Sequence, residues 1–207
     1  PYSEEHGVYL QQDGFLDKEL ITVANLDKSQ RPINQKWSWD RILRSPYIKQ
    51  ADTLQGFYFF EDHFTKEELE KHFDFYEPFT VHESSLSPCV HSIQAAVLGR
   101  MEQAYTFYLR TSRLDLDDYN KEVEEGLHIT SMAGTWMSIV EGFGGMRVKN
   151  NQLHFEPKIP AQWNGYSFKV NFRNAIVKVD VSHQGTAVSV DGNQDVAVIV
   201  NGESQLV

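Results

Sequence analysis

The hydrophobic pattern of this chain changes its period at about residue 145. Before that point, apolar residues recur every three or four positions, which indicates helices with one buried face. Beyond it, apolar and polar residues alternate, which is typical of strands with one buried face. We therefore predict an α+β chain, with helical hairpins in residues 1–145 and a small antiparallel β-sheet or sandwich domain in residues 146–207.

The strongest helical signal covers residues 87–116, where apolar residues recur at helical spacing from Val90 to Tyr108. Pro88 suits the first turn of a helix that starts there. Thr65 and Glu68 have the spacing of a capping box, which marks the start of the preceding helix. Short connections between such helices favour antiparallel packing of neighbours.

A further helix is expected over residues 128–143, with one apolar face made of Ile129, Met132, Trp136, Ile139 and Val140. Residues 1–30 contain few periodic runs and are expected to be irregular and rich in turns.

Two turn signals organise the predicted β region. Asn150-Asn151 should join two short strands within residues 146–157, and Asp191-Gly192 should join the alternating segments that flank it. Further alternating segments lie at residues 166–174 and 175–183. Together these patterns predict an antiparallel unit of about five or six strands.

Composition excludes several classes of partner. The net charge of −10 would repel nucleic acid and anionic membranes, so any bound anion needs local donors. The single cysteine, Cys89, cannot form an internal disulfide and fits a reducing compartment. No apolar run approaches the ~20 residues that span a bilayer, and no signal segment opens the sequence. A cytoplasmic location is therefore expected.

The segment HESSLSPCVHS contains the first candidate site, Ser84 and Ser85 beside His82 and Glu83. A serine nucleophile is disfavoured, because the G-x-S-x-G pattern is absent and no strand precedes the pair. Adjacent hydroxyls at a helix N-terminus could bind phosphate or another oxyanion. The alternative is that the serines, together with Ser87, only cap the helix.

Two other segments carry candidate binding residues. His128 and Gly134 lie around another predicted helix start, where they could face an anion or serve only capping and packing. Lys49 and Gln50 are predicted to open another helix and could hold sugar hydroxyls or compensate a dianion, although an isolated surface lysine is the simpler interpretation. No metal-ligand spacing and no nucleotide-binding loop is present, so neither a metal nor a cofactor is expected.

The segments EEHGVYLQQDGFLD, IKQADT, HESSLSPCVHSI and EGLHITSMAGTW occur in this order, followed by GMRV and L-x-F-x-P-x-I-P-x-x-W. This series resembles the inverting disaccharide phosphorylases of glycoside hydrolase family 65, which act on maltose, trehalose or kojibiose. The resemblance covers essentially the whole sequence, and it is strongest to the maltose-specific members. It implies the C-terminal half of an (α/α)6 barrel followed by a small β domain, and a longer natural chain.

The resemblance also implies a reaction and site roles. A disaccharide would be cleaved by phosphate to give glucose and β-glucose 1-phosphate, with inorganic phosphate as a substrate. Phosphate would bind to Ser84, Ser85, His128 and the backbone N–H near Gly134. Lys49 and Gln50 would contact glucose. The general-acid glutamate of the family would lie upstream of Pro1, so no catalytic residue is assigned here and this segment alone should be inactive.

Two alternatives remain open. If Glu83 activated water, the enzyme would be a glycoside hydrolase on the same barrel. A half-barrel could also be a non-catalytic sugar-binding scaffold. Either way, a half-barrel should expose apolar helix faces, which predicts association with the missing N-terminal part of the chain or formation of a homodimer.

Overall fold

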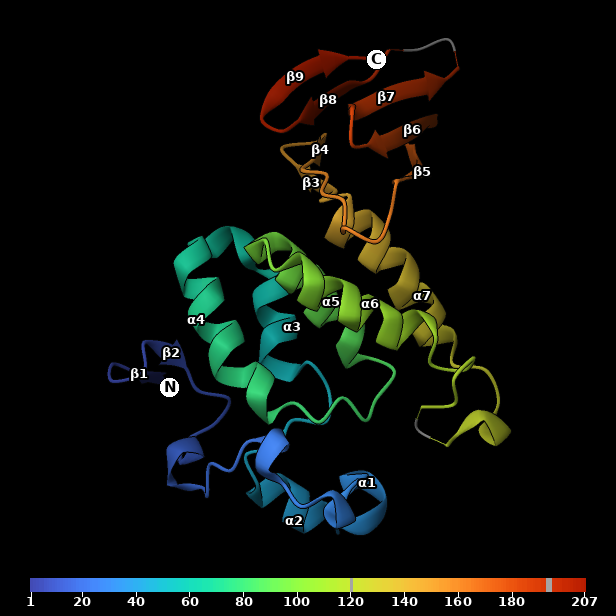
Figure 1. Cartoon of the computed structure of the whole chain (residues 1–207). Helices are drawn as coiled ribbons and strands as arrows, with labels where there is room; N and C mark the ends of the chain where they lie inside the picture. The colour runs from blue at the N-terminus through green and yellow to red at the C-terminus, as the bar shows by residue number, and fades with distance from the viewer. Residues whose placement is uncertain (120, 193–194) are drawn as a thin grey trace.

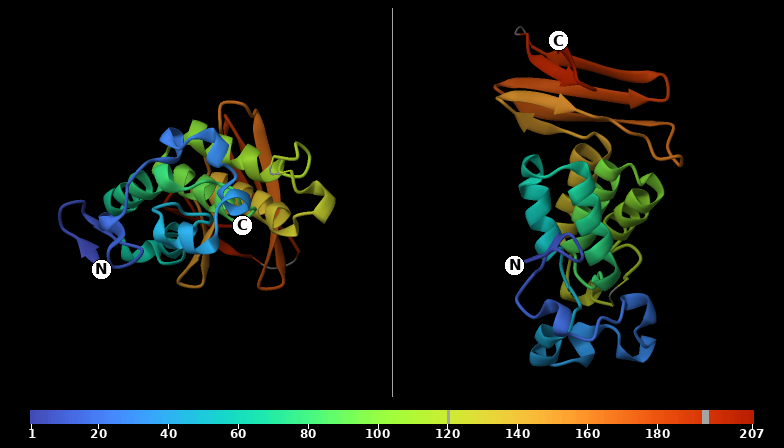
Figure 2. Two further views of the ribbon diagram at one scale, coloured as in Figure 1. Left: turned by 90° about the horizontal axis from the view of Figure 1, so that it is seen from below. Right: turned by 90° about the vertical axis from the view of Figure 1, so that its left-hand side faces the viewer.

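The computed structural model describes residues 1–119, 121–192 and 195–207. Figure 1 shows an elongated arrangement in which the N-terminal segment, the helices and the β-strands follow one another. The two views in Figure 2 keep this order, with the β-sheets at one end of the molecule.

Helices and helical turns dominate the chain up to Phe143, after a short strand pair of β1 (Tyr2–Ser3) and β2 (Val8–Tyr9). The α-helices are α1 (Ile33–Lys36), α2 (Trp39–Arg44), α3 (Asp52–Phe59), α4 (Lys66–Tyr76), α5 (Ser87–Leu98), α6 (Met101–Ser112) and α7 (Ile129–Met137), which continues as the π-helical η7 (Ser138–Phe143). The 3-10 turns are η1 (Phe15–Asp17), η2 (Val23–Asn25), η3 (Lys28–Gln30), η4 (Glu61–His63), η5 (Glu77–Phe79) and η6 (Val123–Glu125).

The predicted capping box at the start of α4 is confirmed. The Thr65 hydroxyl accepts a hydrogen bond from the Glu68 N–H, and the Glu68 carboxylate accepts one from the Thr65 N–H. The two bonds satisfy amide groups that have no partner within the helix, so this start is fixed by local chemistry.

The prediction of helix through residues 87–116 is wrong at Gly99. There the backbone has φ 84°, a left-handed conformation that ends α5, and α6 begins two residues later. The chain reverses, so α5 and α6 are antiparallel neighbours, joined by a hydrogen bond from the Ser92 hydroxyl to the Ala104 carbonyl. The helical spacing of apolar residues continues across the turn because both helices bury their apolar faces in one core.

Helices α3 and α5 run parallel. Ala51, at the start of α3, packs with Cys89 and Val90 near the start of α5. Further along both helices, the Gln94 side-chain amide donates to the Leu54 carbonyl at 2.7 Å. The residue numbers rise together in both helices, so their N-termini lie at the same end.

Helices α5 and α7 also run parallel. A Cβ atom on Gly134 would lie 2.7 Å from the Cβ of Cys89, and one on Gly142 would lie 3.4 Å from the Cα of Ile93. Glycine therefore allows this close backbone approach, which fixes the depth at which α7 packs on α5.

The predicted apolar face of the helix over residues 128–143 is buried only at its C-terminal end, where Val140 is fully buried and Ile139 packs on the same cluster. Ile129 is 67 % exposed, Met132 46 % and Trp136 48 %, whereas Ser131 and Gly134 are buried. The small residues take the inner side because α5 and α7 approach closely. The large side chains are thereby left on the outer side of α7.

The β part contains β3 (Arg147–Lys149), β4 (Gln152–Phe155), β5 (Gly165–Phe172), β6 (Ala175–Ser182), β7 (Gly185–Asp191), β8 (Ala197–Val200) and β9 (Glu203–Leu206). One sheet has the order β3-β4-β8-β9 and the other β5-β6-β7. The hairpin turn at Asn150-Asn151 is confirmed, with φ values of 50° and 62°.

The predicted hairpin over Asp191-Gly192 is wrong. Strand β7 pairs with β6, whereas β8 joins the other sheet and runs parallel to β4, with Leu153 opposite Val198. This pairing buries Val198 and Val200 with Leu153 and Phe155 in one apolar cluster. Tertiary burial therefore overrides the local turn signal.

Polar and aromatic contacts join the β part to the helices. The Arg147 guanidinium donates to the Glu61 carboxylate and to the Glu141 carbonyl. Trp163 packs its ring edge-on against Tyr108 and Phe143, at centroid distances of 5.1 and 4.9 Å. These contacts place the sheets near the C-terminal end of η7, away from the N-termini of α3, α5 and α7 (Figure 1).

Candidate functional site

The candidate binding residues converge at one end of the helical part. Lys49-Gln50 precede α3, Ser84-Ser85 precede α5, and His128 is the N-cap residue of α7. Because α3, α5 and α7 are parallel, these segments share the end that carries the positive poles of the helix dipoles. Such an end favours a bound anion although the net charge of the chain is −10.

Backbone bonds connect the segments that precede α3 and α5. The Ile48 N–H donates to the Phe79 carbonyl at 2.9 Å, and the Val81 N–H donates to the Ile48 carbonyl at 3.0 Å. On the other side, the Ser131 hydroxyl of α7 donates to the Thr111 carbonyl of α6 at 2.8 Å. The segment before α3 is thus tied to the segment before α5, and the first turns of α7 are tied to α6.

The two serines lie in a half-buried loop just before α5. The Ser84 hydroxyl accepts a hydrogen bond from the Leu86 N–H at 3.2 Å. The N-cap residue is Leu86, which provides no side-chain cap, and Pro88 occupies the first turn as predicted. Ser84 therefore supports the helix start from outside the N-cap position, and the simple capping interpretation is incomplete.

Glu83 is buried and braces this loop. One carboxylate oxygen accepts from Arg31 Nε at 3.1 Å, and the other accepts from the Ile33 N–H at 2.6 Å. Both oxygens are therefore occupied by groups at the start of α1, which leaves Glu83 poorly suited to activate water.

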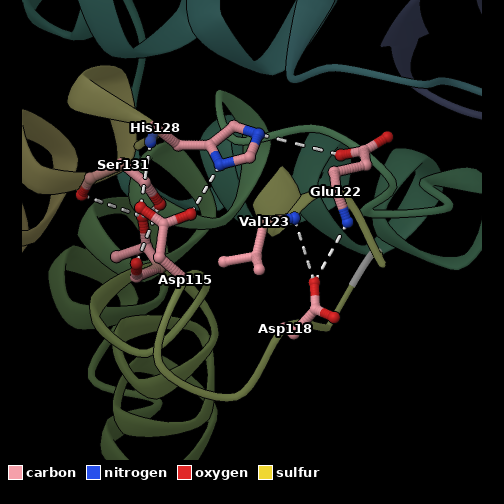
Figure 3. A network of polar contacts seen from close by, with 7 residues as sticks. Asp115, Asp118, Glu122, Val123, His128 and Ser131 are labelled. Carbon is pink, nitrogen blue, oxygen red and sulfur yellow. Dashed lines mark hydrogen bonds and ion pairs between the residues drawn. The ribbon is translucent and has the colours of Figure 1, made fainter. Parts of the chain in front are cut away.

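His128 is held by acidic side chains (Figure 3). Its Nδ1 lies 2.5 Å from one Asp115 oxygen, and its backbone N–H donates to the other at 2.9 Å. The Glu122 carboxylate lies 3.8 Å from Nε2. The backbone N–H and then the ring of His128 lower the pKa of Asp115, so this carboxylate is ionised and keeps a proton on Nδ1. Sequence reasoning missed Asp115, because its partner lies thirteen residues away.

Gly134 lies beyond the first turn of α7, in contact with Cys89 rather than at the helix start. The amide groups that lack intrahelical partners belong to the first turn. The role of Gly134 in phosphate binding therefore stays a prediction, and its structural role is the close packing of α7 on α5.

Lys49 and Gln50 line a cavity of about 280 Å³ together with Trp39 and Tyr47. The Lys49 ammonium lies 5.5 Å from the centre of the Trp39 ring, and Trp39 is 64 % exposed. Helix α3 begins at Asp52, so both residues lie in the preceding loop rather than in the helix. An open cavity with an aromatic wall and a few polar groups suits a sugar.

Beneath the serine loop, His91 is completely buried. Its Nδ1 donates to the Ser87 carbonyl at 2.9 Å, and the ring packs edge-on against His82. Burial, and next the neighbouring His82, lower the pKa of His91 to about 3. The ring is therefore neutral in the folded protein near pH 7.

This burial predicts a pH dependence of stability. An unfolded histidine has a pKa near 6.5, so the stabilisation from neutral His91 is complete above that value and is lost as the pH falls toward about 3. In His91→Phe, the free energy of unfolding should fall less steeply as the pH drops from 6.5 to 4. The slope of the variant should differ from that of the parent by up to about 1.4 kcal/mol per pH unit. Urea unfolding at several pH values measures this slope. The exposed control His63→Phe should retain it, and an unchanged slope in His91→Phe would contradict the prediction.

Comparison with known families matches both parts of the chain. Residues 1–137 match the glycosyl hydrolase family 65 central catalytic domain, and residues 146–207 match the C-terminal domain of that family. The chain belongs to glycosyl hydrolase family 65. Its helical part is accordingly a portion of an (α/α)6 barrel, followed by the small β domain.

Relatives of this family 65 chain include a maltose phosphorylase from Bacillus subtilis (strain 168), 56 % identical over 89 % of the chain and 24 % of the relative. An alpha,alpha-trehalose phosphorylase from Thermoanaerobacter brockii is 44 % identical over 92 % of the chain and 24 % of the relative. A solved structure, a putative kojibiose phosphorylase from human microbiome, is 38 % identical with a TM-score of 0.91, covering 99 % of this chain and 28 % of that one. The chain thus spans about a quarter of the length of the relatives it matches.

Within residues 1–119, 121–192 and 195–207, no helix combines the length and apolar character needed to cross a membrane. The same ranges contain no group of three histidine, cysteine or acidic side chains arranged to hold a metal ion.

Proposed function

We propose that this chain is the C-terminal portion of a disaccharide phosphorylase that cleaves maltose with inorganic phosphate, giving glucose and β-glucose 1-phosphate with inversion. The observation that carries the proposal is the convergence of Ser84-Ser85, His128 and Lys49-Gln50 at the N-termini of parallel helices. The 56 % identity to a protein named maltose phosphorylase favours maltose over other disaccharides.

Phosphate binds between the starts of α5 and α7 in this proposal. The Ser84 and Ser85 hydroxyls and the His128 ring donate to phosphate oxygens, and the helix dipoles add favourable potential. Asp115 holds a proton on Nδ1 of His128. Nε2 donates to the phosphate in the doubly protonated ring, because a neutral ring with its proton on Nδ1 offers Nε2 only as an acceptor. Because phosphate itself attacks the anomeric carbon, the site needs no carboxylate that activates water.

The glucose unit at the bond to be broken lies near Lys49 and Gln50, in the cavity that Trp39 also lines. The general acid is supplied by a glutamate in the portion of the longer protein outside this chain. On this basis the 207-residue chain alone should not release glucose from maltose.

The outer face of α7 is the contact for the rest of the longer protein. Ile129, Met132 and Trp136 form an exposed apolar row on α7. Covering it would stabilise the helix by removing apolar surface from water. A homodimer of the longer protein is also proposed, and light scattering of that protein tests it.

The decisive experiment measures glucose release from maltose with and without phosphate. It uses the longer natural protein, or the Bacillus subtilis relative in which this chain replaces the matching segment. Release that requires phosphate, with equal formation of glucose 1-phosphate, supports the proposal. Equal release without phosphate would establish a hydrolase, and turnover of trehalose or kojibiose but not maltose would correct the substrate.

A further inference from the structure

We propose that His82 and Arg110 are positioning residues of the phosphate site, which fix the loop that carries Ser84 and Ser85. This inference rests on the proposed function, since it assigns no contact with phosphate to either residue. It concerns the histidine of the HESS segment, which the proposed reaction leaves without a role.

The backbone of His82 is the first observation. Its φ is 53°, in the left-handed region that non-glycine residues seldom adopt. Such a conformation persists where surrounding contacts hold it. Here the Arg110 Nη2 of helix α6 donates to the His82 carbonyl at 2.7 Å. This bond fixes the peptide unit that leads directly into Glu83 and the serines.

The side chain of His82 also makes contacts that fix its position. Its Nδ1 lies 3.2 Å from the Ser87 hydroxyl, across the loop that contains both serines. The ring packs against His91 and Phe107, with centroids 4.5 and 4.8 Å away. Burial lowers the pKa of His82, so the ring is neutral near pH 7 and adds no charge beneath the loop. The contact between His82 and Ser87 therefore bridges the two ends of the serine loop.

Arg110 reaches the serine loop from helix α6. It lines a cavity of about 680 Å³ with Tyr119 and Thr106, and its guanidinium carbon lies 4.9 Å from the centre of the Tyr119 ring. The Arg110 bond holds His82, and the ion pair with Arg31 holds Glu83. The two residues directly before Ser84 are therefore both fixed. A loop held in this way loses less conformational entropy when its hydroxyls receive an anion.

The test measures Michaelis constants for phosphate and for maltose, and the melting temperature, in the longer protein. Arg110→Met should raise the phosphate constant about tenfold and change the maltose constant less than twofold. Arg113→Met is the matched control, because Arg113 lies at the end of the same helix and pairs with Asp117 at the surface. The control should leave both constants unchanged.

Two variants of His82 distinguish the effect of its backbone conformation from the effect of its ring. His82→Asn can retain the left-handed backbone, since asparagine tolerates positive φ, so its phosphate constant should rise less than that of His82→Ala. If both variants and Arg110→Met leave the phosphate constant within twofold of the parent, the proposal is overturned. It is equally overturned if both constants and the melting temperature change together, which would mean a purely structural role.

The same assay distinguishes failure of the proposed phosphate site. The double variant Ser84→Ala, Ser85→Ala is included in every series. An unchanged phosphate constant there rejects the phosphate site itself. A raised constant in the double variant, with no effect at His82 and Arg110, rejects only the positioning roles.

Discussion

Replacing Ser84 and Ser85 together by alanine should raise the Michaelis constant for phosphate about a hundredfold, with little change in the constant for maltose. In the proposed site each hydroxyl provides one hydrogen bond to the phosphate, worth roughly 1.5–3 kcal/mol, or about tenfold or more in binding. Both hydroxyls lie in the half-buried loop that opens α5, where the helix dipole strengthens contact with an anion. Initial rates at varied phosphate, in the longer protein, provide the measurement.

The control for this experiment removes a hydroxyl far from the site. Ser182→Ala, at the end of β6, should leave both constants unchanged. His128→Ala should resemble the serine variants, because its ring is proposed to donate to the same phosphate. An unaltered phosphate constant in the double serine variant would refute the assignment.

Glu83→Ala should lower the free energy of unfolding by about 1–3 kcal/mol, the usual cost of leaving a buried donor without its acceptor, because the Arg31 side chain is 34 % exposed and keeps part of its hydration. The Glu83 side chain is only 6 % exposed and its carboxylate accepts from Arg31 and from the Ile33 N–H. Its removal leaves a buried amide without an acceptor and a guanidinium without its counterion. Urea unfolding of this chain at pH 7 measures the loss.

Two variants make the Glu83 result specific. Glu83→Gln keeps an acceptor but loses the charge, so its loss should be smaller, and the exposed Glu124→Ala should change stability by less than about 0.5 kcal/mol. A hydrolase in which Glu83 activates water predicts the opposite pattern. In that case both Glu83 variants would be as stable as the parent and would abolish glucose release in the absence of phosphate.

Local signals predicted the elements whose ends are fixed by neighbouring residues. The Thr65–Glu68 capping box and the Asn150-Asn151 turn are both present, because each depends on bonds within a few residues. The same kind of reasoning failed at Gly99 and Asp191-Gly192. At Gly99 the helix end is itself set locally, by a left-handed glycine whose N–H donates to the Ala95 and Ala96 carbonyls, and the prediction passed over this signal. At Asp191-Gly192 the outcome depends on which distant segment receives the apolar side chains, and local pattern carries no such information.

By itself, the sequence determined the change from helices to strands, the membership in family 65 through its motifs, and the residues to consider at the site. Only the tertiary structure decided that α3, α5 and α7 run parallel and so place those residues at one end. It also revealed that Asp115 holds His128, and that Arg110 holds the backbone of His82. The physical reason is that helix starts and turns are set by short-range bonds, whereas convergence arises from side-chain packing between segments far apart in the chain.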